Sequence, residues 1–208
     1  MIIKKLEVGP IMANCYIIGC DKTKEAVVID PGDEADKILI ELSKLSLIVK
    51  YIINTHGHFD HVGANKRLKE VTKAKLLIHP EDEHMLSQLS KSAANWGLSA
   101  ENSPLPDQKI IHGDEIVFGE ITLKVIYTPG HSLGGVCLYT DGVVFSGDTL
   151  FANSIGRTDF PTGDHDTLIA SIKEKLFLLD DDTIVYTGHG PETSIGHERK
   201  TNPFLMGS

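Results

Sequence analysis

The stretch Thr55-His56-Gly57-His58-Phe59-Asp60-His61 decides how the rest of the sequence is interpreted. It places three imidazoles and one carboxylate within six residues, directly after the apolar run 51–54. Burying so many polar and ionisable groups together is unfavourable unless a cation binds them. In an extended loop His56 and His58 point to the same side, whereas Asp60 and His61 can turn toward a neighbouring point. The spacing therefore predicts a site for two adjacent metal ions.

Three later segments share one form, in which a β-branched or aromatic run ends in a glycine-containing turn that presents a His or an Asp. They are residues 127–131, 145–148 and 186–190. Catalytic zinc sites take three protein ligands and leave one position open for water or substrate. The four segments together predict two metals, a shared carboxylate and an open bridging position. The candidate ligands are His56, His58, Asp60, His61, His131, Asp148 and His189.

Short runs of β-branched and aromatic residues predict strands in both halves of the chain. The first half has 15–18, 26–29, 51–54 and 75–78, and the second has 116–118, 121–127, 136–139, 143–146 and 183–186. Apolar spacing predicts a helix that Asp33 caps, a helix around 64–71 with Val71 inward, and a helix over 168–179. Two β-rich halves that each carry helices predict a layered α/β sandwich.

Composition limits what the chain can be. Its 208 residues suit one continuous domain, 1–208, because domains usually have about 100–200 residues and no repeat or linker interrupts the sequence. A formal net charge of -9 is a poor match for nucleic acid or anionic lipid. No apolar run approaches the roughly 18 residues of a membrane span, and no signal peptide is recognisable. We expect a cytoplasmic protein that binds a small molecule, with no nucleic acid and no membrane as partner.

Two further features bear on the site. Cys15, Cys20 and Cys137 lie in strand-like runs without a CxxC pair, which indicates buried, reduced thiols and not metal ligands. Residues 92–106 lack periodicity, so we predict a long loop of the kind that often forms a lid. Trp96, the only tryptophan, lies in that segment.

Several polar residues have more than one interpretation. Asp30 could orient a metal-bound imidazole or simply shape the turn before Pro31. Arg157 could bind a substrate carboxylate, pair with Asp159 or pack its loop. The basic run Lys66, Arg67, Lys69, Lys73 and Lys75 is interpreted as a solvated helix face. The histidines without a partner at ligand spacing are interpreted as solvated or structural, and they are His79, His84, His112, His165 and His197.

The order of these motifs resembles the metallo-β-lactamase superfamily, from about Ile3 to Phe204. Residues 147–151, 154–159 and 188–193 resemble its single-domain glyoxalase II-like branch. The resemblance implies a four-layer αββα sandwich of two mixed sheets with helices on the outer faces and a dinuclear site at one edge. By position, it implies that His56, His58 and His131 hold the first metal, that Asp60, His61 and His189 hold the second, and that Asp148 bridges them.

The resemblance also implies a metal-dependent hydrolase. Its substrate would be an acyl thioester, an S-2-hydroxyacyl-thiol such as S-lactoylglutathione, attacked by a hydroxide that bridges two divalent metal ions and that Asp60 orients. Zinc is the expected metal, although iron and manganese also suit imidazole and carboxylate ligands. Arg157, Phe151 and Trp96 are expected to contact substrate. Because only 19 residues follow His189, we expect no C-terminal glutathione-binding domain.

Two other functions are alternatives. Persulfide dioxygenases of the same superfamily use one Fe(II) held by residues that match His56, His131 and Asp148, and they share a string like Gly156-Arg157-Thr158-Asp159-Phe160. A non-catalytic metal-binding module is the further alternative, which the open set of ligands disfavours. Many true lactamases carry cysteine at the position of Asp148, which disfavours a lactamase.

Overall fold

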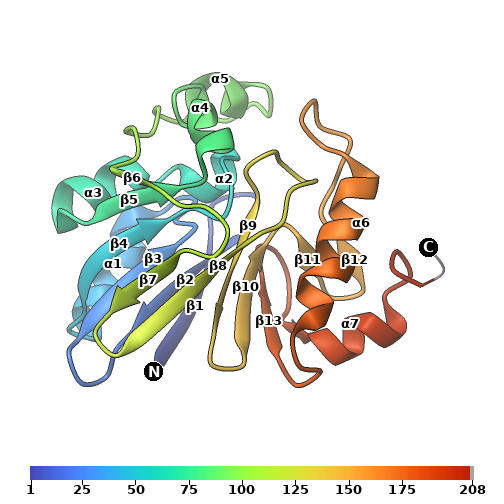
Figure 1. Ribbon diagram of the computed structural model, residues 1–208. Helices are drawn as coiled ribbons and strands as arrows, with labels where there is room; N and C mark the ends of the chain where they lie inside the picture. Colours follow the sequence, from blue (N-terminus) through green and yellow to red (C-terminus); the bar gives the residue numbers. More distant parts are fainter. Residues whose placement is uncertain (207–208) are drawn as a thin grey trace.

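Two six-stranded mixed sheets form the centre of the computed structural model, which describes residues 1–206 (Figure 1). The first sheet has the order β1-β2-β3-β4-β5-β6, formed by Ile2–Val8, Ala13–Gly19, Glu25–Ile29, Ile48–Ile53, Lys75–Ile78 and Gln108–Lys109. The second has the order β14-β13-β10-β9-β8-β7, formed by Thr193–Ser194, Ile184–Thr187, Val143–Gly147, Val136–Thr140, Ile121–Tyr127 and Glu115–Phe118. A small hairpin pairs β11 (Leu150–Phe151) with β12 (Ser154–Ile155).

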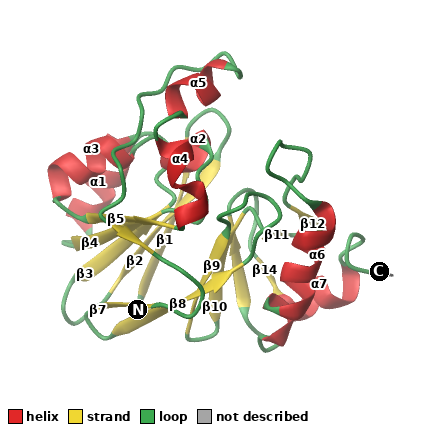
Figure 2. Ribbon diagram, turned by 45° about the horizontal axis from the view of Figure 1, so that its top comes forward, coloured by secondary structure: helices red, strands yellow, loops and turns green. Residues whose placement is uncertain are grey.

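Helices lie on both outer sides of the sheet pair (Figure 2). Those associated with the first sheet are α1 (Ala35–Lys44), α2 (Phe59–Val62), α3 (Asn65–Thr72), the 3-10 turn Pro80–Asp82, α4 (Glu83–Leu86) and α5 (Leu89–Ala94). Those on the second sheet are α6 (His165–Glu174), the 3-10 turn Leu176–Leu178 and α7 (Ile195–Thr201). The predicted αββα sandwich of two mixed sheets is therefore confirmed. Within residues 1–206, every helix is too short or too polar to cross a membrane.

The first sheet is buried on both faces, which explains its continuous apolar runs. Ile18, Val27 and Ile53 belong to the core cluster between the sheets, together with Leu138 and Phe145 of the second sheet. Successive residues of a strand point to opposite faces. Ile17, Val28 and Ile52 accordingly form the outer cluster with residues of α1 and α3.

The outer face of the second sheet is covered in the same way. Val144 and Val185 pack in one cluster with Leu168 and Ile172 of α6. This cluster also contains Cys137, whose thiol is free and buried, as are those of Cys15 and Cys20. The prediction of buried thiols is confirmed, and burial raises the pKa of Cys137 to about 11.

Four local predictions need correction, and the first two concern the helices α1 and α3. Asp33 does not cap a helix, because α1 begins at Ala35 and the preceding Glu34 takes a left-handed conformation with φ 51°. Asp33 instead accepts a hydrogen bond from the backbone N–H of Glu34. Val71 does not point inward but is 47% exposed, because α3 buries Asn65 and Leu68 and ends at Thr72.

The long loop begins later than predicted, because α5 continues to Ala94. Gly97, with φ 71°, then turns the chain, and the N–H of Leu98 bonds back to the carbonyl of Ala93. The predicted helix over 168–179 is interrupted at Lys175 and continues as the 3-10 turn Leu176–Leu178.

Candidate metal centre

The candidate ligands lie at one edge of the sandwich, where strands of both sheets end. The HxHxDH segment follows β4, whereas His131, Asp148 and His189 follow β8, β10 and β13. Strands β10 and β13 are parallel, and β8 runs in the same direction because β8 and β10 are both antiparallel to β9. The carboxyl ends of these strands of the second sheet therefore open toward one place, and the loop after β4 reaches it from the first sheet.

One group of ligand atoms is formed by His56, His58 and His131. Their atoms lie within 4.8 Å of one another, and Nδ1 of His58 is 2.9 Å from Nε2 of His131. His56 and His131 are buried, and His58 is half-buried. Three imidazoles so close together share space that a single cation can occupy. These are the three residues that the resemblance assigns to a first metal.

A second group is formed by Asp60, His61 and His189. Their ligand atoms also lie within 4.8 Å of one another, with Nε2 of His61 3.1 Å from Nε2 of His189. Oδ2 of Asp60 is 3.3 Å from Nε2 of His189. The first turn of α2 aims Asp60 and His61 at this second point, away from His58 just before the helix.

Asp148 faces both groups. Its Oδ2 atom lies 3.5 Å from Nε2 of His131 and 3.7 Å from Nε2 of His189, and its Oδ1 atom lies 3.4 Å from Nε2 of His61. One carboxylate thus lies between a histidine of the first group and two of the second. This is the placement that a carboxylate shared by two ions needs.

The chemistry of these side chains fits bound cations. Nε2 of His56 and Oδ1 of Asp148 are buried and make no hydrogen bond within residues 1–206. A buried polar atom without a partner is unfavourable, and a metal ion would satisfy both atoms. Nδ1 of His131 donates to the carbonyl of Arg157, which leaves its Nε2 to face the site.

Asp30 supports the site from below, as one of its two interpretations expects. Its Oδ2 atom is 3.2 Å from Nδ1 of His61, the ring nitrogen that points away from the second group. Thr55 donates to the same carboxylate from its N–H at 2.7 Å and from its hydroxyl at 2.6 Å. Asp30, His56 and His61 also come within ligand distance of one another. Because Thr55 already occupies both oxygens of Asp30, we assign it to orienting His61 and not to binding a metal.

The ionisable groups shift one another's protonation. Burial, followed by the charge of neighbouring imidazoles, lowers the pKa of His56 far below its ordinary value and that of His58 to about 4. Burial also opposes a charge on His61, but the carboxylates that face it, Asp148 first, raise its pKa to about 10. For Asp60, facing imidazoles outweigh burial and hold the pKa far below its usual range. At neutral pH His56 and His58 are thus uncharged and can donate a ring-nitrogen lone pair to a metal ion. Asp60 is ionised, as metal binding also requires.

A cleft of about 560 Å³ opens directly over these ligands. Trp96, Phe151 and Arg157, the three residues expected to contact substrate, all lie in its wall. The Trp96 ring is 6.1 Å from that of Phe59, and the Phe151 ring is 6.2 Å from that of His189. The Arg157 guanidinium forms a two-point ion pair with Asp159, so its pairing interpretation describes this structure.

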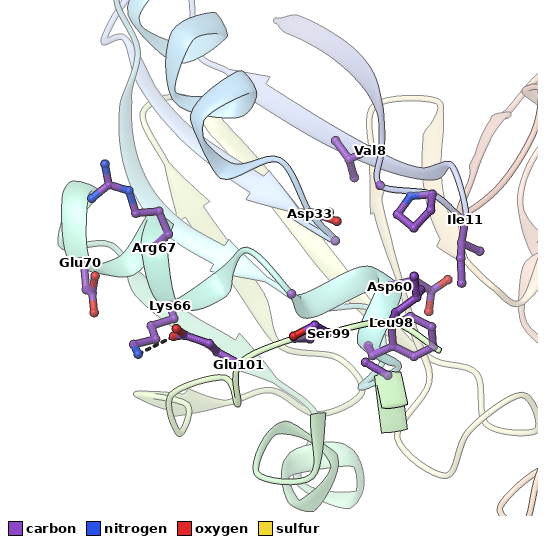
Figure 3. A pocket seen from close by; sticks show the side chains of 17 residues that line it. Val8, Ile11, Asp33, Asp60, Lys66, Arg67, Glu70, Leu98, Ser99 and Glu101 are labelled. Carbon is purple, nitrogen blue, oxygen red and sulfur yellow. Dashed lines mark hydrogen bonds and ion pairs between the residues drawn. The ribbon is translucent and has the colours of Figure 1, made fainter. Parts of the chain in front are cut away.

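A second cavity, of about 540 Å³, lies beside α2 (Figure 3). It shares Ile11, Phe59 and Asp60 with the metal cleft. In its wall, Lys66 pairs with Glu101 at 2.6 Å.

Two residues of the site escaped the sequence analysis. Asp82 is fully buried beneath the ligand loops, although the surrounding acidic residues suggest a solvated segment. Phe160 lies against the ligands, its ring 4.9 Å from that of His58 and 5.8 Å from that of His131. Residues 156–160 resemble a string of persulfide dioxygenases, but the sequence alone does not place the Phe160 ring against these histidines.

The remaining histidines stay outside both ligand groups, as predicted. His79 is structural, since its ring accepts from the N–H of Glu81 and stacks on Tyr127 with centroids 4.5 Å apart. His84 is exposed in the wall of the cleft. The basic run does not form one helix face, because Lys66, Arg67 and Lys69 lie on α3, whereas Lys73 follows the helix and Lys75 begins β5. Lys69 is paired, with its ammonium 2.6 Å from the carboxylate of Asp107.

Comparison with known proteins agrees with this geometry. The family description "Metallo-beta-lactamase superfamily" matches residues 8–189, a span that contains every candidate ligand. The chain belongs to this superfamily. A relative from Haemophilus influenzae named hydroxyacylglutathione hydrolase GloC is 39% identical over 207 residues, which covers 96% of this chain and 97% of that protein.

Solved structures extend the comparison within this superfamily. The BLEG-1 B3 metallo-beta-lactamase has a TM-score of 0.93 and 38% identity, covering 99% of this chain and 100% of that one. TTHA1623, solved in a di-iron-bound form, has a TM-score of 0.90 and 40% identity, covering 97% and 100%. ETHE1 from Myxococcus xanthus has a TM-score of 0.81 and 32% identity, covering 98% and 84%. Proteins with differing names thus share this fold, so the function must be argued from the site.

Proposed function

We propose that this protein is a metal-dependent hydrolase of acyl thioesters, with S-2-hydroxyacyl conjugates of a small thiol, such as S-lactoylglutathione, as substrates. The observation that carries the proposal is the placement of Asp148 between two groups of three ligands at the floor of an open cleft. The similarity to hydroxyacylglutathione hydrolase GloC over almost the whole chain supports the same substrate class.

Two divalent cations fit the site, and we propose zinc, with iron or manganese as the alternatives. His56, His58 and His131 would hold one, Asp60, His61 and His189 the other, and Asp148 both. Such ions lower the pKa of a bound water to about 7 and polarise a carbonyl group. The di-iron-bound form of TTHA1623 supports the proposal that this fold can hold two metal ions.

The protein groups then orient the reaction. The Asp60 carboxylate is ionised and half-buried beside His189, so it can accept a hydrogen bond from the attacking water and direct it. Phe59, Trp96 and Phe160 provide apolar walls that exclude solvent around the reacting carbonyl. The leaving thiolate has an ordinary pKa of about 8–9, so its departure needs no strong acid. Accordingly, the carboxylates among the described residues that line the cleft, Asp60 and Asp148, are candidate metal ligands and are not needed as acids.

The charge of the rim favours an anionic substrate. Among the described residues that line the cleft, Asp60 and Asp148 are the only carboxylates. Lys91 lies on the rim and makes no hydrogen bond or ion pair with any residue of 1–206, whereas the charge of Arg157 is already paired with Asp159. In a protein of net charge -9, this cationic rim, which rests on the unpaired Lys91, is a local exception that would attract the carboxylates of a thiol carrier.

The decisive experiment measures hydrolysis of S-lactoylglutathione by protein loaded with zinc, iron or manganese, with Asp148→Ala as the inactive control. We expect turnover by the loaded wild type and a loss of several decades in the variant. A β-lactam assayed in parallel tests the activity named for BLEG-1. Hydrolysis of the β-lactam without hydrolysis of any thioester would overturn the proposal.

A persulfide dioxygenase is the second candidate, because two residues of the string Gly156-Arg157-Thr158-Asp159-Phe160, Arg157 and Phe160, line the cleft and Phe160 packs on two of the candidate ligands. It would need one iron, held by His56, His131 and Asp148. Oxygen uptake with a glutathione persulfide, measured together with metal content, separates the two functions. One iron per chain with oxygen uptake would favour the dioxygenase.

A further inference from the structure

Asp82 ends the 3-10 turn Pro80–Asp82 and has no exposed surface. Its carboxylate accepts three hydrogen bonds. Oδ2 accepts from the N–H of Gly57 at 2.9 Å and from the hydroxyl of Ser132 at 2.7 Å, and Oδ1 accepts from the N–H of Gly134 at 2.7 Å. Hydrogen bonds to an ionised acceptor are roughly twice as strong as neutral ones. Asp82 is therefore a firm anchor for the loops that it joins.

These loops carry the first group of ligands. Gly57 lies between His56 and His58, in the loop after β4 of the first sheet. Ser132 directly follows His131, in the loop after β8 of the second sheet. One buried carboxylate thus links two segments that come from different sheets. Across this link, Nδ1 of His58 lies 2.9 Å from Nε2 of His131.

The two glycines show how closely the loops press on this anchor. A Cβ atom on Gly134 would lie 2.7 Å from the backbone N and from Cγ of Asp82, and one on Gly57 would lie 3.0 Å from its carbonyl oxygen. Neither glycine has a positive φ. Space, and not backbone conformation, is what requires glycine at both positions.

We propose that Asp82 is a positioning residue that fixes the separation of His58 and His131 and thereby sets the affinity of the first metal. It acts on the ligands through the backbone of Gly57 and through Ser132, without touching a metal itself. His84, which is exposed, and Met85 follow Asp82 in the chain and line the cleft. Asp82 therefore also connects this part of the cleft wall to the two loops that carry His58 and His131. The proposal rests on the ligand set of the proposed function but not on any substrate.

Asp82→Asn tests the proposal, because the amide keeps the size of the carboxylate but turns one acceptor into a donor. Glu198→Gln is the matched control. Glu198 is equally buried and also accepts three hydrogen bonds, from the N–H of Asn153, the hydroxyl of Thr193 and the amide of Asn202. It lies on α7, outside the cleft. Both changes leave a buried group unsatisfied and should destabilise the fold.

The readout is zinc affinity, measured by competition with a chromophoric chelator in a His189→Ala background that weakens the second site. We expect Asp82→Asn to weaken the remaining zinc by about 10- to 100-fold, the usual effect of losing an outer partner of a ligand. Glu198→Gln should leave that affinity within about threefold of the parent, although its melting temperature falls too. Ser132→Ala removes only one of the three bonds and should give an intermediate loss of affinity.

Equal zinc affinity in Asp82→Asn and Glu198→Gln would overturn the proposal, because it would reduce Asp82 to a stabilising residue. If Asp82→Asn does not fold, wild-type zinc affinity in Ser132→Ala would overturn it as well. Both results are independent of thioester hydrolysis. Failure of the proposed activity therefore leaves this test unaffected.

Discussion

Oδ1 of Asp148 lies 3.4 Å from Nε2 of His61, and this buried oxygen has no hydrogen-bond partner among residues 1–206, although the opposite oxygen faces two further histidines. Such a carboxylate is incomplete in the protein alone. Its two oxygens complete the surroundings of both ligand groups at once, which makes it the most informative residue to remove.

Asp148→Ala should reduce metal binding more than His189→Ala. The carboxylate faces both groups, whereas His189 belongs only to the second. We expect His189→Ala to retain close to one metal per chain after desalting and Asp148→Ala to retain less than that. Elemental analysis of both variants, expressed with excess metal, makes the measurement. Equal retention would contradict the shared role of Asp148.

Two divalent ions should bind per chain and stabilise the fold. A ligand present at about 100 times its dissociation constant stabilises the native state by about 2.7 kcal/mol. For a protein of this length, each kcal/mol shifts the melting temperature by roughly 2–4 °C. Stripping with a chelator should therefore lower the melting temperature by at least about 5 °C, and adding back zinc should restore it. A stripped protein with an unchanged melting temperature would contradict metal binding at this site.

The stability of the metal-free protein should be greatest near pH 6.5. The pKa of His58 is about 4 in the fold, below the ordinary histidine value of about 6.5. Between these values the unfolded chain binds more protons, so stability falls as pH falls. The pKa of His61 is about 10 in the fold, so its contribution is complete below pH 6.5 and is lost as pH rises toward 10.

Urea midpoints of the stripped protein between pH 5 and 9 measure this dependence. In the metal-loaded protein the alkaline decline attributed to His61 should disappear, because the ion takes the place of the proton on Nε2. An alkaline decline of equal size with and without metal would show that other groups cause it.

The convergence of the candidate ligands could be predicted because each follows an apolar run at a strand end, and such runs are visible in a sequence. The sandwich followed from the same signal, since two halves with strands and amphipathic helices have few ways to bury their apolar faces. Strand β1 (Ile2–Val8) was missed because an edge strand is only partly buried and shows little periodicity. The two-residue strands β6, β11, β12 and β14 are too short to carry a pattern.

Asp82 could not be predicted for a different reason. Its neighbours Glu81 and Glu83 make the segment look like a solvated acidic turn. Its burial depends on donors from Gly57 and Gly134, which lie 25 and 52 residues away. Contacts of that range arise only when the two sheets meet, so composition and spacing contain no trace of them.

Lys91 should discriminate between thiol carriers by charge. It is exposed on the rim of the cleft and has no partner within residues 1–206, so an anionic ligand meets an uncompensated ammonium group. Exposed ion pairs contribute about 0.2–1 kcal/mol, which corresponds to roughly a 1.5- to 5-fold change in affinity. Lys91→Gln should therefore weaken binding of S-methylglutathione by that factor. It should leave binding of a neutral S-methyl thioether of N-acetylcysteamine unchanged.

Trp96 makes the measurement direct, because this single tryptophan lines the same cleft and its fluorescence reports binding without hydrolysis. Lys73→Gln is the matched control, since Lys73 is also exposed but lies at the end of α3, away from the metal cleft. Salt should reduce the preference of the wild type for the anionic ligand, because exposed charges are screened over about 10 Å at 0.1 M ionic strength. If Lys91→Gln lost equal affinity for the anionic and the neutral ligand, Lys91 would contribute by packing and not by charge. A preference of the wild type for the neutral ligand would contradict the cationic rim itself.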